Sequence, residues 1–143
     1  TGYFAVRLAR TVPQGRVFGA DVEPDMVRFL NERAGKERLA NLRSVLAAAD
    51  GPNLPVAVDL ALLVDTYHHI PKRALYFMQL KKALRPGGRV AIIDFRLDSP
   101  VGPPARYRIA PENVAEEMAL AGYRMLEQHD FLPHQYFLVF APR

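Results

Sequence analysis

Residues 84–95 read LRPGGRVAIIDF, and this stretch decides the fold. Its Pro-Gly-Gly ends the helix that is predicted to begin at Pro71, because proline cannot continue a helix and glycine relaxes the turn. The apolar run 89–95 then predicts a strand that is buried on both faces. A helix followed closely by such a strand is typical of α/β proteins with a parallel sheet.

The same alternation extends over the rest of the chain. Helical spacing of apolar residues predicts helices at 2–11, from Pro24, from Pro71 and at 111–121. Apolar runs predict strands at 16–22, 42–49, 58–65, 89–95, 124–130 and 136–141. The last two strands are joined too briefly for a parallel crossover, so they form an antiparallel hairpin. We therefore expect an α/β fold with a mostly parallel sheet, helices on both faces and a C-terminal hairpin.

Composition sets the broad class of protein. The 143 residues are 50% hydrophobic and 24% charged, which predicts a single globular domain over 1–143. The chain has no cysteine, so thiolate metal sites and disulfides are excluded and a cytoplasmic location is expected. The net charge of +4 forms no basic block, so we expect no nucleic-acid partner. The apolar runs are too short to span a membrane.

Polar side chains follow each predicted strand, where open α/β sheets bind ligands. Asp21, Asp50, Asp65 and Asp94 stand at or just after the ends of four successive strands. A carboxylate at the end of the first of these strands suits the two hydroxyls of a ribose. The alternative is that Asp21 caps the helix that begins at Pro24.

His68 and His69 lie just beyond the strand 58–65. A neutral histidine there can accept a proton from a substrate, so both are candidate catalytic residues. The alternative is a structural histidine that is hydrogen-bonded to backbone. No spacing of ligands for a metal is found, and we expect no metal.

Four stretches of the chain resemble the class I S-adenosylmethionine-dependent methyltransferases, particularly the small-molecule branch related to ubiquinone and menaquinone biosynthesis. They are TGYFA (1–5), FGADVEPDM (18–26), LLVDTYHHI (62–70) and LRPGGRVAIIDF (84–95), of which the last is the most specific. The resemblance implies a Rossmann-like class I methyltransferase sandwich and S-adenosylmethionine as cofactor. It further implies that the following residues bind the cofactor: Thr1, Gly2, Tyr3, Asp21, Val22, Met26, Asp50, Val64 and Asp65.

The resemblance also implies that an element is missing. The family's first strand lies at the centre of the sheet, beside the fourth, and its glycine-rich turn wraps the donor; here the strand and the first half of that motif are absent. We therefore expect either an N-terminally truncated fragment or a missing piece supplied in trans, because a sheet without its middle strand leaves backbone groups unpaired.

The expected function is methyl transfer to an unidentified small-molecule acceptor by in-line displacement, with a homodimer as a possible assembly. One alternative is a methyltransferase-like binding or scaffold protein without activity. A further alternative is a nicotinamide-dependent oxidoreductase, which would share the glycine turn and Asp21.

Overall fold

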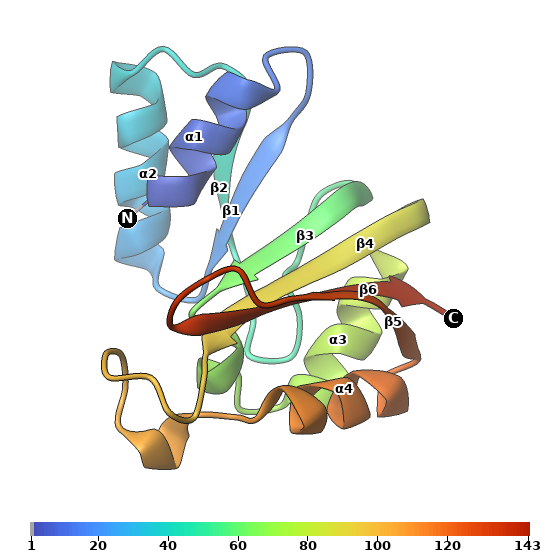
Figure 1. Ribbon diagram of the computed structural model, residues 1–143. Coiled ribbons are helices and arrows are strands. Elements are labelled where there is room, and N and C mark those ends of the chain that lie inside the picture. The colour runs from blue at the N-terminus through green and yellow to red at the C-terminus, as the bar shows by residue number, and fades with distance from the viewer. Residues whose placement is uncertain (1) are drawn as a thin grey trace. The chain divides into compact units, whose positions relative to one another are not determined.

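The computed structural model describes residues 2–143, which form two compact units, one ending at Pro55 and the other spanning Val56–Arg143 (Figure 1). The first unit holds α1 (Tyr3–Thr11), β1 (Val17–Asp21), α2 (Pro24–Lys36) and β2 (Leu42–Leu46). The second holds β3 (Val58–Val64), η1 (Tyr67–His69), α3 (Arg73–Lys82), β4 (Leu84–Phe95), η2 (Ala105–Tyr107), α4 (Pro111–Leu120), β5 (Tyr123–His129) and β6 (Gln135–Pro142). The order of helices and strands confirms the prediction; the two short 3-10 turns, η1 and η2, were not predicted.

In the first unit, β1 and β2 form a parallel pair in which Gly19 lies opposite Ser44. Both helices contribute to one apolar core, which is made of Val6, Ala9, Leu30, Ala34 and Leu42. Gly19 has to be small, because a Cβ added there would lie 2.4 Å from a methyl group of Leu30. Gly2 meets the same side chain and has a φ of 87°, a conformation that favours glycine.

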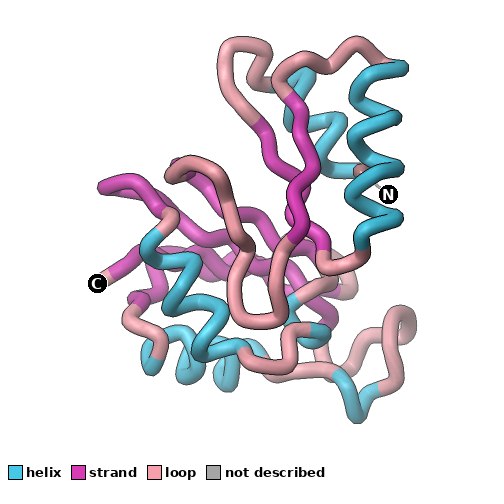
Figure 2. Tube along the Cα trace, turned by 180° about the vertical axis from the view of Figure 1, so that it is seen from behind, coloured by secondary structure: helices cyan, strands magenta, loops and turns pink. Residues whose placement is uncertain are grey.

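In the second unit, four strands form a sheet in the order β3-β4-β6-β5. β3 and β4 are parallel, and β6 is antiparallel to both β4 and β5, which confirms the predicted hairpin. Figure 2 shows that the strands of each unit are flanked by that unit's own helices. α3 and α4 lie side by side, and Val114 and Met118 of α4 are completely buried.

The buried face of α3 is formed by Phe77 and Leu80. Leu75 and Met78, whose spacing also fits a helix, are exposed. Both stripes of this helix are apolar, so periodicity alone does not separate them. The aromatic ring of Phe77 decides the face, because it stacks on the buried ring of Tyr67 with 5.4 Å between centroids.

The strands form two hydrogen-bonded sheets, whereas a single sheet was expected. β1 and β3 are each an edge strand, and residues 2–143 do not include the strand that the resemblance leads us to expect beside β3. Within the same residues, none of the helices is long and apolar enough to cross a membrane.

Candidate functional site

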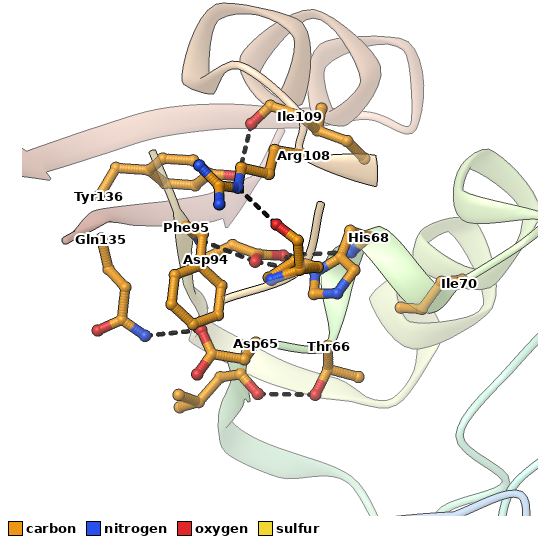
Figure 3. Close-up of polar contacts among 12 residues, drawn as sticks. Asp65, Thr66, His68, Ile70, Asp94, Phe95, Arg108, Ile109, Gln135 and Tyr136 are labelled. Atoms are coloured by element: carbon orange, nitrogen blue, oxygen red, sulfur yellow. Dashed lines mark hydrogen bonds and ion pairs between the residues drawn. The ribbon is translucent and has the colours of Figure 1, made fainter. Parts of the chain in front are cut away.

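The second unit brings a histidine and an aspartate together at the carboxyl ends of β3 and β4 (Figure 3). The Nδ1 atom of His68 lies 2.9 Å from each carboxylate oxygen of Asp94. The carboxylate also accepts the backbone N–H groups of His68 (3.2 Å) and Phe95 (2.8 Å). Both side chains are only 4% exposed, so the pair is shielded from water and its geometry is fixed.

Strand pairing places this pair. Asp94 lies near the end of β4, where it pairs with Tyr136 of β6. The backbone N–H of Asp65 continues the parallel ladder past the end of β3, donating to the carbonyl of Ile93 at 2.8 Å. The chain then turns through Asp65, whose φ is 52°, and η1 returns His68 toward Asp94.

Asp65 is the second carboxylate at this edge. Its Oδ1 accepts a hydrogen bond of 2.6 Å from Nε2 of Gln135, at the start of β6. Burial raises the pKa of Asp65 above its ordinary value; the Gln135 hydrogen bond opposes this effect and the negative charge of Asp94 adds to it. Figure 3 shows these side chains grouped around the same strand ends.

The contact with Asp94 selects one tautomer of the neutral His68 ring. Nδ1 donates to the carboxylate, which leaves Nε2 as the basic nitrogen of the neutral ring. A buried carboxylate in this position also stabilises the imidazolium that forms when Nε2 takes up a proton. The ring of His69 lies 4.1 Å from that of His68, centroid to centroid, but His69 itself is exposed.

The first unit holds most of the predicted cofactor-binding residues. Asp21 ends β1, and its Oδ1 accepts the backbone N–H of Glu23 at 3.0 Å. This contact orders the turn before α2 without capping the N–H groups of the helix itself. The side chain of Val22 is exposed and that of Met26 is half-buried in the first turn of α2.

The remaining predicted binding residues have few contacts. Gly2 immediately precedes α1, and the exposed ring of Tyr3 packs against the guanidinium of Arg7, 3.7 Å from its centroid. Asp50 lies exposed in the loop after β2, and Val64 ends β3 half-buried. Thr1 lies outside the described residues.

The sequence reasoning missed one contact and one residue of the site. Asp94 was expected at this edge as a strand-end acid, but its pairing with His68, 26 residues away, carries no sequence signal. Gln135 has no signal at all, since its contact with Asp65 spans 70 residues. Among residues 2–143, there is no group of three or more acidic or histidine side chains placed to hold a metal ion.

The fold and this edge define an α/β protein of the Rossmann-like class I methyltransferase type. A crystal structure of an S-adenosylmethionine-dependent methyltransferase from Aquifex aeolicus matches 97% of this chain and 76% of its own, with a TM-score of 0.89 and 22% identity. A family model described as a methyltransferase domain matches residues 1–131. The chain therefore belongs to this methyltransferase domain family.

Relatives in sequence also carry methyltransferase names. A 27-O-demethylrifamycin SV methyltransferase from Amycolatopsis mediterranei is 35% identical over 102 residues, 68% of this chain and 37% of that protein. The ubiquinone/menaquinone biosynthesis C-methyltransferase UbiE from Syntrophotalea carbinolica is 28% identical over 98 residues, 66% of this chain and 40% of that protein. The chain thus spans well under half the length of these two relatives.

Proposed function

We propose that this chain binds S-adenosylmethionine and directs methyl transfer to a small-molecule hydroxyl group. The observation that carries the proposal is the buried pair of His68 and Asp94, found in a member of a methyltransferase domain family. The name of one relative indicates methylation of an oxygen and that of the other methylation of a carbon, so the relatives do not decide the acceptor atom. The hydroxyl acceptor is inferred from the pair of His68 and Asp94.

The chemistry of the first unit fits S-adenosylmethionine. Among the described residues, Oδ1 of Asp21 accepts only the backbone N–H of Glu23, so the carboxylate keeps acceptor capacity for the hydroxyls of a ribose. Exposed Val22 and half-buried Met26 offer apolar surface for an adenine ring. The proposed binding set also includes Thr1, Gly2, Tyr3 and Asp50, together with Val64 and Asp65 from the second unit. When bound, the cofactor would supply a methyl group that is already activated by its sulfonium.

The residues of the second unit would move the acceptor's proton. A hydroxyl is a weak nucleophile while it carries its proton, and Nε2 of His68 is the basic nitrogen at the strand ends. Asp94 holds the ring in the required tautomer and stabilises its protonated form. An acceptor that is already anionic needs no such base, so the pair favours a neutral hydroxyl over a phenolate or a carboxylate. His69 is the second candidate for the same role.

The proposal also covers the domain organisation, the cellular location and the oligomeric state. We propose that residues 1–143 form one methyltransferase domain, because the family model matches residues 1–131, a range that includes residues of both units. A cytoplasmic location and a homodimer complete the proposal. The match to a methyltransferase domain family gives no support to the oxidoreductase alternative. A measurement of methyl transfer distinguishes an active enzyme from an inactive binding protein.

Titration calorimetry tests the proposal. We expect S-adenosylmethionine and its thioether by-product S-adenosylhomocysteine to bind, and NADH to give no heat of binding. Products formed from methyl-labelled donor in cell extract would then identify the acceptor. Binding of NADH in place of S-adenosylmethionine, or binding of neither, would overturn the proposal.

A further inference from the structure

The short turn η1, which carries both candidate histidines, has little stability of its own. Its internal hydrogen bonds are those from the N–H of His69 to the carbonyl of Thr66 (2.9 Å) and from the N–H of Ile70 to the carbonyl of Tyr67 (3.2 Å). A single turn of 3-10 helix fixes several dihedral angles for very few hydrogen bonds. The position of His68 therefore depends on contacts that the turn makes with the rest of the unit.

Asp94 provides one such contact, through the ring and the backbone N–H of His68. A second lies one residue earlier in the turn. Tyr67 is completely buried, and its hydroxyl donates a hydrogen bond of 2.5 Å to Oε2 of Glu117 on α4. The turn is thus held by a carboxylate from β4 and by another from α4.

Arg73 links the second carboxylate back to the turn. Its Nε and Nη2 atoms donate to the two oxygens of Glu117 at 2.6 and 3.0 Å, a bidentate pair of the strong kind. Its Nη1 donates to the carbonyl of Ile70 at 3.2 Å, directly after the turn. Glu117 is therefore joined to the turn through Tyr67 at one end and through Arg73 at the other.

Charge favours this arrangement. The hydrogen bond and the positive charge of Arg73 lower the pKa of Glu117, so the residue is a carboxylate at neutral pH. Burial and the neighbouring carboxylate raise the pKa of Tyr67, so its hydroxyl keeps the proton that it donates. Each group is held in the ionisation state that its partner needs.

We propose that Glu117, acting through Tyr67 and Arg73, is a positioning residue for His68. This inference rests on the proposed function, because it concerns the residue assigned there as the base. Proton transfer requires heavy atoms within hydrogen-bond reach, and a displacement of about 1 Å is costly to the rate. The hydrogen bonds of Glu117 go to Tyr67 and Arg73 and not to His68 or Asp94, so its effect on the base passes through the backbone of the turn.

A pair of tyrosine variants separates positioning from general stability. Tyr67→Phe removes the hydroxyl that meets Glu117. Tyr123→Phe is a matched control, since Tyr123 is also fully buried, also contacts the ring of Phe77, and loses a single hydrogen bond of 2.7 Å to the carbonyl of Phe77. Glu117→Gln is a third variant, which keeps an acceptor for Tyr67 but removes the charge that holds Arg73.

Two measurements by NMR report on the turn without methyl transfer. Hydrogen exchange of the His69 and Ile70 amides follows opening of the turn, and nitrogen shifts of the His68 ring follow its tautomer. His129 and His134 provide internal reference signals. We expect Tyr67→Phe and Glu117→Gln to speed exchange of both amides by about 10-fold or more and to shift the His68 ring signals. We expect Tyr123→Phe to leave both readouts as in the wild type.

The result that overturns the proposal is unchanged exchange and an unchanged His68 ring in a folded Tyr67→Phe or Glu117→Gln protein. An equal change in Tyr123→Phe would also overturn it, because the effect would then be one of general stability. Neither readout depends on a cofactor or an acceptor. Failure here therefore contradicts the role of Glu117, whereas failure to bind S-adenosylmethionine contradicts the proposed function.

Discussion

In the unit that ends at Pro55, the candidate binding side chains are poorly constrained: Tyr3 and Val22 are 56% and 55% exposed, and the carboxylate of Asp21 makes one hydrogen bond. In the unit that follows, the side chains of His68 and Asp94 are 4% exposed and joined at both carboxylate oxygens. An exposed set gains its contacts when a ligand arrives, whereas a buried hydrogen-bonded pair is already organised for chemistry. Under the proposed function, most of the cofactor-binding residues lie in the first unit, and the proposed base lies in the second.

The largest expected effect tests the second half of that assignment. His68→Ala removes the proposed base and Asp94→Asn removes the carboxylate that sets its tautomer. We expect each to lower turnover by about 10²- to 10⁴-fold while the Kd for S-adenosylmethionine stays near that of the wild type. The measurement is the rate of methyl transfer to the acceptor identified from cell extract, together with calorimetry.

A double variant of His68 and Asp94, and a variant of the neighbouring His69, test the same assignment further. His68→Ala with Asp94→Asn is expected to be no slower than the worse single variant, because the two residues act as a unit. His69→Ala tests the second candidate: the side chain of His69 is exposed, whereas that of His68 is buried beside Asp94, so this variant should retain most of the activity. A His69 variant as slow as the His68 variant would transfer the role of base to His69.

A smaller effect is expected in the first unit. Asp21→Ala removes the carboxylate proposed to bind the ribose, and loss of charge-assisted hydrogen bonds should weaken S-adenosylmethionine binding by about 10- to 100-fold. Asp25→Ala is the control: Asp25 lies four residues later, is highly exposed, and makes a surface ion pair with Arg28. Calorimetry on both variants decides the point, and equal Kd values for the two would remove Asp21 from the proposed site.

The same contrast shows what the sequence can predict. Apolar runs and periodicity placed nearly every helix and strand, because those patterns are local. They also placed Asp65 and Asp94 at strand ends, where a parallel sheet collects them. The contact between His68 and Asp94 depends on the register of β3 on β4 and on the turn at Asp65, which a linear pattern does not encode. Gln135 reaches Asp65 from the far end of the chain, by strand order alone.

The smallest expected effect is on the free energy of unfolding, through the partly buried carboxylate of Asp65. The pKa of Asp65 is raised above its ordinary 3.8, chiefly by burial, so the folded chain binds this proton more tightly than the unfolded chain. The contribution of Asp65 to the free energy of unfolding therefore falls as pH rises from 3.8 through the raised pKa. Asp65→Asn removes the charge, and asparagine tolerates the positive φ at this position.

Urea unfolding of the wild type and Asp65→Asn at a series of pH values measures this cost. The difference in unfolding free energy between the two, variant minus wild type, should grow as pH rises through that window and then level off at neutral pH, with the variant the more stable protein. Asp59→Asn is the control, because Asp59 is highly exposed and pairs with Arg85 at the surface, so its difference should show no such rise. A flat or falling difference for Asp65→Asn would mean that burying the charge of Asp65 costs no stability. The difference in organisation between the two units would then rest on His68 and Asp94 alone.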